Sequence, residues 1–288
     1  MHIARMQVSP AIHSMSYHSY TQIEKLIGCR RLAEKITGQP VVVMGFQRSG
    51  TSLLTNLVHS CGVSLGKENE FRPPLISNPH GFFEHRKIFR LSWKYLRQAG
   101  IQDGMTQNIS FTPTSFRRKI ERLVTVRKMH VTLNRLSSSG DKWGMKLFPL
   151  FYYFWKVYLP KHKIVAIYRD PYASTHSYLE VFWPARFTYD DGLKQWLQAQ
   201  KDMLYHITQA NSLLIRYEDL VDDSKNDRIL QSLADFIGGG DVSRLKSLID
   251  PSLNRSIKKV SRLSNTYPED NEISHILRIL DNLRVGPA

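Results

Sequence analysis

The stretch from Val41 to Cys61 constrains the fold of this chain more than any other part of the sequence. It begins with the wholly apolar run Val41–Met44, which is rich in β-branched residues and typical of a buried strand in a parallel sheet. A short polar loop that starts at Gly45 follows, and Ser52–Cys61 then carries apolar residues at helical spacing. This order of strand, glycine loop and helix predicts a βα unit with an anion site at the helix N-terminus.

The rest of the chain alternates between apolar runs typical of strands and segments with helical periodicity. Such alternation favours a parallel sheet with helices on both faces. We therefore expect an α/β fold, a single domain with a central parallel sheet flanked by helices and a P-loop-like nucleotide-binding site. The expected strands are Trp143–Phe148, Lys163–Tyr168 and Ser212–Tyr217, and the expected helices are Phe116–Leu136, Ala173–Val181, Gly192–Ala210 and Asp227–Ile237.

The domain organisation follows from the two ends of the chain. Residues 1–37 are expected to form an N-terminal arm that ends in an amphipathic helix at Thr21–Ile36. Residues 38–288 are expected to form the main domain, because no internal repeat or linker divides them. The tail after Pro251 is polar and mixed, and we expect it to be a lid or a surface extension.

The formal net charge of +15 favours anionic ligands. A non-enzymatic nucleic-acid binder is one alternative, but no stretch interleaves basic and aromatic residues, so we expect no nucleic-acid partner. Neither cysteine belongs to a CxxC pair, which argues against a thiolate metal site. No signal peptide or apolar run of membrane-spanning length is present, so we expect a cytoplasmic protein without a membrane span.

The polar loop matches the Walker A pattern GxxxxGK[ST] only in part. Gly45, Gly50 and Ser52 fit the pattern, but Thr51 stands where nucleotide triphosphatases need a lysine. That lysine reaches the β- and γ-phosphates, so its absence weakens the alternative of a P-loop kinase. The basic residue lies inside the loop instead, at Arg48.

This displaced basic residue matches a different family. The segment GFQRSGTSLL resembles the 5′-phosphosulfate loop of sulfotransferases that use 3′-phosphoadenosine 5′-phosphosulfate (PAPS), and Arg-Ser-Gly-Thr-Ser is similar to the loop of bacterial-type members. The resemblance implies a sulfotransferase fold in which loop N–H groups and side chains bind the nucleotide. The implied residues are Arg48, Ser49, Gly50, Thr51 and Ser52.

A second segment, KIVAIYRDPYASTHSY, resembles the 3′-phosphate motif of the same family. An arginine at the end of a strand and a serine in the next helix can converge on one phosphate, and here these are Arg169 and Ser177. The segment RYEDL resembles the part of the family in which a tyrosine lies near the adenine, which implies that role for Tyr217. The late segment Arg255–Lys259 is either a basic loop over the 3′-phosphate or a solvated surface.

The resemblance also indicates catalytic residues. Arg48 would stabilise the charge that develops on the transferred group. The segment NPHGFFEH resembles a bacterial signature that ends in a glutamate, so Glu84 is the leading candidate for the general base, with His85 and then His80 behind it. Glu84 could instead pair with Arg86 or anchor its loop, and burial beside aromatic rings would raise the pKa of a carboxylate there.

We therefore expect a sulfotransferase that transfers a sulfuryl group from PAPS to a hydroxyl or amine of a small-molecule acceptor, releasing 3′-phosphoadenosine 5′-phosphate (PAP) without a metal. The acceptor is expected to belong to secondary metabolism, with a carbohydrate or glycolipid as the alternative. The sequence leaves the oligomeric state open. The loops expected to form the acceptor pocket are Lys67–Ser77, Gln102–Thr114 and Phe182–Tyr189.

Overall fold

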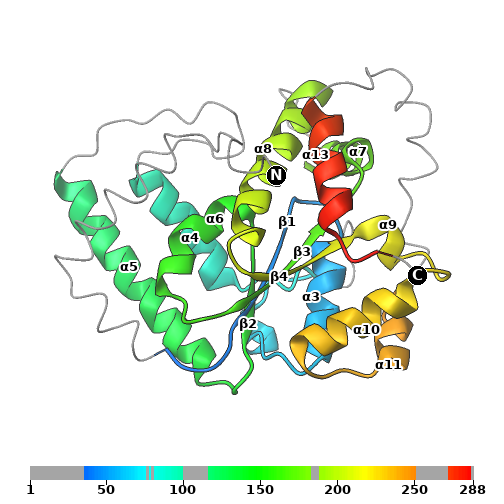
Figure 1. Ribbon diagram of the computed structural model, residues 1–288. Helices are drawn as coiled ribbons and strands as arrows, with labels where there is room; N and C mark the ends of the chain where they lie inside the picture. The colour runs from blue at the N-terminus through cyan, green and yellow to red at the C-terminus, as the bar shows by residue number, and fades with distance from the viewer. Residues whose placement is uncertain are drawn as a thin grey trace.

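The centre of the molecule is a four-stranded sheet whose strand order is β2-β1-β3-β4 (Figure 1). The computed structural model describes residues 36–75, 78, 81–99, 116–182, 188–250 and 272–286. Every pair of neighbouring strands is parallel, which confirms the expected architecture. Each observed strand lies within one residue of its expected bounds: β1 is Val41–Gly45, β2 Gly144–Leu147, β3 Lys163–Tyr168 and β4 Asn211–Arg216.

Both faces of the sheet are buried, as the continuous apolar strands require. In β1, Val42 and Met44 pack into one core, while Val41 and Val43 pack into the core on the opposite face. Helices α4, α5, α6, α8 and α13 cover the first face, and α3, α10 and α11 cover the second (Figure 1). The described residues therefore form one α/β domain around a single sheet.

The helices agree with the expected ones where the sequence has clear periodicity. The structure places α5 at Phe116–Ser137, α7 at Pro171–Phe182, α8 at Tyr189–Ile207 and α10 at Asn226–Ile237. The remaining elements are α3 (Thr51–Ser60), η2 (Glu68–Glu70), α4 (Arg86–Gln98), α6 (Pro149–Trp155), η3 (Lys156–Tyr158), α9 (Tyr217–Leu220), α11 (Val242–Ser247) and α13 (Glu272–Leu283).

The C-terminal tail differs from the expectation of a lid or surface extension. Its described part contains α13, in which Ile276 and Leu280 are buried in the core against α8 and β4. Apolar residues four positions apart lie on one face of a helix, so α13 packs as an amphipathic core helix. The expected helix at Thr21–Ile36, and with it the arm of residues 1–37, lies outside the described residues except for its end.

The strand order places a topological switch point at the carboxyl ends of β1 and β3. After β1 the chain enters α3 on one face of the sheet, and after β3 it continues through α7 to α8 on the other face. Ligands of open α/β sheets bind at such a switch point. In the ranges that the structure describes, no helix combines the length and the apolar character needed to cross a membrane.

Candidate active site

The loop between β1 and α3 holds two residues in the left-handed backbone region. Arg48 has a φ of 64° and Gly50 a φ of 87°. A non-glycine residue at such an angle is strained, and strain of this kind is concentrated at functional sites. No side chain caps α3, so the N–H groups of its first turn are available to an anion at the positive end of the helix dipole.

Close contacts require glycine at both Gly45 and Gly50, and at Gly50 the positive φ requires it as well. A Cβ atom at Gly45 would lie 2.5 Å from the carbonyl oxygen of Ile167, which belongs to β3. A Cβ atom at Gly50 would lie 2.3 Å from Cδ2 of Tyr217. The loop is therefore pressed between β3 and the Tyr217 ring, and no larger residue fits without moving one of them.

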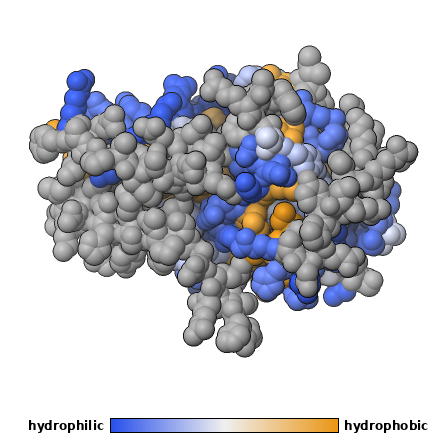
Figure 2. Space-filling view, turned by 90° about the horizontal axis from the view of Figure 1, so that it is seen from above, coloured by the Kyte–Doolittle hydropathy of each residue, from blue (hydrophilic) through white to orange (hydrophobic). Residues whose placement is uncertain are grey.

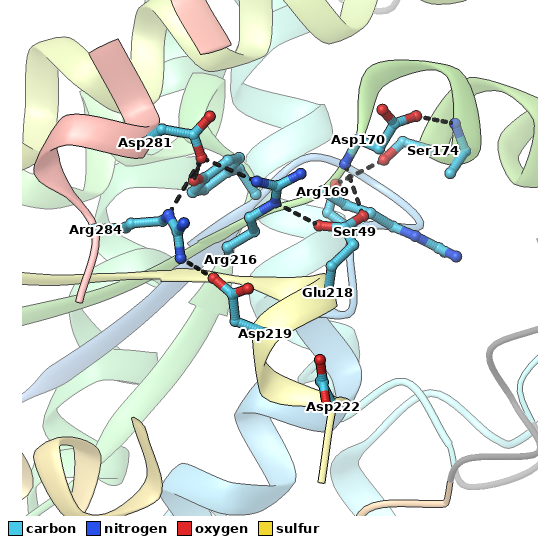
Figure 3. Close-up of polar contacts among 12 residues, drawn as sticks. Ser49, Arg169, Asp170, Ser174, Arg216, Glu218, Asp219, Asp222, Asp281 and Arg284 are labelled. Carbon is cyan, nitrogen blue, oxygen red and sulfur yellow. Dashed lines mark hydrogen bonds and ion pairs between the residues drawn. The ribbon is translucent and has the colours of Figure 1, made fainter. Parts of the chain in front are cut away.

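The two expected phosphate motifs lie against each other in the structure. The Nη1 group of Arg169 donates to the carbonyl oxygen of Arg48 at 3.1 Å, across 121 residues of sequence. Arg48 in turn donates from Nε to the Ser177 hydroxyl at 3.0 Å. The buried hydroxyls of Ser49 and Ser174 lie 3.3 Å apart (Figure 3). Two arginines and several hydroxyl groups thus gather at the carboxyl ends of β1 and β3, and such donors suit phosphate and sulfate groups.

Tyr217 stands beside this pair of motifs, at the start of α9. The guanidinium of Arg169 lies over its ring, 4.4 Å from the centroid, and the ring also lies close to Gly50. Burial raises the pKa of the Tyr217 phenol, although the neighbouring Arg169 and Arg48 lower it. Thr51 and Ser52 complete the loop; the Thr51 side chain is buried with its methyl group toward Gly45.

Glu84 is buried in a cluster of charged side chains that reaches Ser52 at the start of α3. Its carboxylate pairs with Arg72 at 2.6 Å and with Lys146 at 3.2 Å. The expected alternative partner, Arg86, donates instead to the backbone oxygen of Asn69. The structure therefore places Glu84 between two cations from distant parts of the sequence, and its part in proton transfer stays a prediction.

Lys146 is a further residue of the site, to which the sequence analysis assigned no catalytic or binding role. Its ammonium group donates to the Ser52 hydroxyl at 3.1 Å and to the backbone oxygen of Phe82 at 2.9 Å, and it also pairs with Glu84. Burial lowers its pKa, while the Glu84 carboxylate raises it. The available signal was its position in β2, where the run WGMKLF places a lysine near the carboxyl end of a buried strand.

His85, the second candidate for the base, is the N-cap of α4. Its Nδ1 accepts a hydrogen bond from the Lys87 N–H at 3.2 Å, and its Nε2 lies 3.6 Å from Glu70. Burial lowers the pKa of His85, although Glu70 raises it. Both ring nitrogens thus have partners of their own, and the role of His85 in the chemistry stays a prediction. His80, the third candidate, lies outside the described residues.

A recess opens beside the Glu84–Lys146 pair and extends over the start of α6. It is shallow and has room for about one water molecule. In the space-filling view from above, apolar surface is visible in a hollow with hydrophilic residues around it (Figure 2). The recess is lined by Glu84, His85, Ile88, Phe89, Lys146, Leu147, Phe148 and Phe151.

The described part of the loop Lys67–Ser77 is not among the residues that line this recess. The recess is built by α4, the end of β2 and α6, which the sequence analysis did not assign to the pocket. The loop Gln102–Thr114 and most of Phe182–Tyr189 lie outside the described residues, as does the segment Arg255–Lys259. Among the described residues, no group of three or more His, Cys, Asp and Glu side chains is placed to hold a metal ion.

Comparison with known proteins identifies the family of this chain. A model described as the sulfotransferase family matches residues 40–239, and a search of curated proteins found no match. A sulfotransferase domain from the curacin biosynthetic pathway is 16% identical over 85% of this chain and 98% of its own, with a TM-score of 0.49. A sulfotransferase domain from the Synechococcus PCC 7002 olefin synthase is 14% identical over 88% and 97%, also with a TM-score of 0.49.

Retinol dehydratase, solved in a complex with retinol and PAP, is 14% identical over 91% of this chain and 88% of its own, with a TM-score of 0.44. The family model covers more than half of the chain and spans both phosphate motifs, the Glu84–Lys146 pair and Tyr217. On this match, the chain belongs to the sulfotransferase family.

Proposed function

We propose that this protein transfers a sulfuryl group from PAPS to a small-molecule acceptor and releases PAP. The observation that carries the proposal is the contact between the two phosphate motifs, in which Arg169 donates to the backbone of Arg48. A nucleotide with phosphate groups at both its 3′ and 5′ positions needs two anion sites, and the two motifs would supply them. Arg169 and Ser177 would bind the 3′-phosphate, and Arg48 with Ser49, Gly50, Thr51 and Ser52 would bind the phosphosulfate.

The transfer is an in-line displacement at sulfur. The acceptor oxygen forms a bond to sulfur, the bond between sulfur and the 5′-phosphate oxygen breaks, and the acceptor proton passes to a base. Negative charge increases on the leaving oxygen, where Arg48 and the first N–H groups of α3 would stabilise it. Arginine stays protonated at all working pH values, so the contribution of Arg48 is electrostatic.

Lys146 is the better candidate for giving a proton to the leaving oxygen. It contacts Ser52 in the first turn of α3, and burial lowers its pKa. A lysine with a lowered pKa releases its proton more readily than an exposed one. Glu84, paired with Lys146 and lining the recess, is the proposed base for the acceptor proton, with His85 as the second candidate.

The aromatic wall of the recess favours an acceptor with an apolar or aromatic body. Phe89, Phe148 and Phe151 line it, and the Arg72 guanidinium covers the rings of Phe82 and Phe89 at 4.6 and 4.7 Å. Pockets for small apolar ligands combine such walls with a few polar groups that set orientation. We therefore propose a hydroxylated secondary metabolite as the acceptor, rather than a carbohydrate or glycolipid head group.

Two measurements test this function. Saturation with PAP at 100 times its dissociation constant should stabilise the protein by about 2.7 kcal/mol without metal, and ATP with Mg²⁺ should stabilise it less. Transfer of labelled sulfate from PAPS to a panel of alcohols then tests the acceptor. Phenols and long-chain alcohols should be sulfated faster than free sugars. Stronger stabilisation by ATP with Mg²⁺ would overturn the sulfotransfer proposal, and faster sulfation of sugars would overturn only the acceptor class.

A further inference from the structure

We propose that Asp281 in the C-terminal helix α13 is a positioning residue for Arg169, because it holds both chain neighbours of that arginine in place. The inference rests on the proposed function, in which Arg169 binds the 3′-phosphate of PAPS. Asp281 would act through these neighbours and would set the affinity for that phosphate. The evidence is a set of contacts that joins α13 to the ends of β3 and β4 (Figure 3).

The first contact reaches the residue that precedes Arg169. Tyr168 is the last residue of β3 and is fully buried, and its hydroxyl donates to Oδ1 of Asp281 at 2.5 Å. A hydrogen bond from a buried hydroxyl to a carboxylate is stronger than one between neutral groups. Asp281 thus holds the side chain of Tyr168, the residue directly before Arg169, in place.

The second connection reaches the residue that follows Arg169. Oδ1 of Asp281 also pairs with Nη1 of Arg216 at 3.3 Å, and Nε of Arg216 pairs with Glu218 at 3.2 Å. The other carboxylate oxygen of Glu218 accepts the N–H of Asp170 at 3.0 Å. Burial alone would lower the pKa of Arg216, but Glu218 and Asp281 raise it, as both ion pairs require.

Helix α13 is itself firmly attached, so it can serve as a support. Ile276 and Leu280 are buried in the core, and the N–H of Val285 donates to Leu214 on β4 at 3.0 Å. Arg284 pairs with Asp281 at 3.2 Å and also with Asp219 in α9. The support therefore also reaches the turn that carries Tyr217, whose ring lies under Arg169.

A guanidinium binds phosphate well only when its planar donors are correctly placed. Loosening the backbone on both sides of Arg169 should weaken binding of the 3′-phosphate and leave the rest of the nucleotide unaffected. Residues that act on a site without contacting its ligand typically change binding by 0.5–2 kcal/mol, which is roughly 2- to 30-fold. That range is the expected loss for Asp281→Asn.

The test is isothermal titration of the full chain with PAP and with adenosine 5′-monophosphate, which lacks the 3′-phosphate. Asp281→Asn should reduce the preference for PAP by roughly 2- to 30-fold with little change for the monophosphate. Tyr168→Phe removes only one contact and should give a smaller loss in the same direction. Glu272→Gln is the matched control, because it removes a different ion pair of α13, the one with Lys201 on α8.

The outcomes separate the two proposals. If Asp281→Asn and Tyr168→Phe only lower the melting temperature and keep the full preference for PAP, the positioning role is wrong. A loss of equal size in Glu272→Gln would also overturn it, because any disturbance of α13 would then suffice. If the unmodified protein shows no preference for PAP, the proposed function fails, and this inference fails with it.

Discussion

Replacement of Gly50 by alanine tests whether Tyr217 and the phosphosulfate loop form one structural unit. The φ of Gly50 is 87°, and a Cβ atom there would lie 2.3 Å from Tyr217. Gly62 has nearly the same φ, 89°, but a Cβ atom there would meet nothing within 4 Å. Gly62→Ala therefore carries the backbone strain alone, and Gly50→Ala carries the strain together with the overlap.

The expected magnitudes follow from these two contributions. Left-handed strain costs about 1–2 kcal/mol for a non-glycine residue. The overlap with Tyr217 should add about 1–3 kcal/mol, as overpacking of a tight core does. Gly50→Ala should thus be destabilised by about 2–5 kcal/mol and Gly62→Ala by about 1–2 kcal/mol. Only Gly50→Ala should also weaken PAP binding, because it moves the ring beneath Arg169.

The assay is urea unfolding followed by titration with PAP. A third variant, Gly50→Ala combined with Tyr217→Ala, isolates the contact. Compared with Tyr217→Ala alone, this double variant should be less stable only by the backbone strain at residue 50, about 1–2 kcal/mol. Equal destabilisation of Gly50→Ala and Gly62→Ala would refute the reasoning, because the Tyr217 contact would then have no energetic weight.

Two further predictions concern the phosphate site and the core. Arg169→Ala should remove most of the preference for PAP over adenosine 5′-monophosphate in a binding titration, whereas Arg117→Ala, an exposed arginine on α5, should keep it. Asp202 is buried, and desolvation raises its pKa to about 7 although Gln198 and Tyr153 donate to it. The folded protein therefore binds one more proton than the unfolded chain between about pH 4 and pH 7, so this group's contribution to stability falls as the pH rises through that range. Asp202→Asn should flatten this part of the stability curve measured by urea unfolding, and an unchanged slope would contradict the assignment.

The fold was readable from the sequence because the central strands carry short apolar runs. Val41–Met44 and Ile164–Tyr168 are buried on both faces, so their hydrophobic pattern depends only on the strand itself. Arg48 and Arg169 were singled out by the resemblance of their segments to two phosphate motifs; Arg48 follows β1 after a short turn, and Arg169 follows β3 directly. Parallel strands then bring their carboxyl ends to one edge of the sheet.

The cluster of charged side chains around Glu84 could not be predicted in this way. Its partners Arg72 and Lys146 come from separate segments, and pairing between distant side chains leaves no periodic signal in a single sequence. The nearby Arg86 was the plausible partner by position, but it extends to Asn69 instead. Helix α6 was missed for a related reason, because the run PLFYYFW is apolar on every face and carries no helical period.

Stability and activity measurements can separate two roles of Lys146. A buried lysine beside Glu84 could act on the transferred group, or it could only neutralise the carboxylate. Lys146→Met should reduce kcat by about 10²- to 10³-fold if its ammonium stabilises the leaving oxygen. The same change leaves Glu84 with Arg72 as its remaining ion-pair partner among the described residues, which should destabilise the protein by up to about 3–5 kcal/mol.

The double variant Lys146→Met with Glu84→Gln distinguishes these roles. Removing both charges should restore much of the stability, because replacing a buried ion pair by neutral groups is often nearly neutral. Activity should be lower than that of Glu84→Gln alone if Lys146 acts on the leaving oxygen, since the double variant also lacks the ammonium next to Ser52. If the double variant is as active as Glu84→Gln alone, Lys146 serves only to neutralise Glu84, and stabilisation of the leaving oxygen rests on Arg48 and the N–H groups of α3.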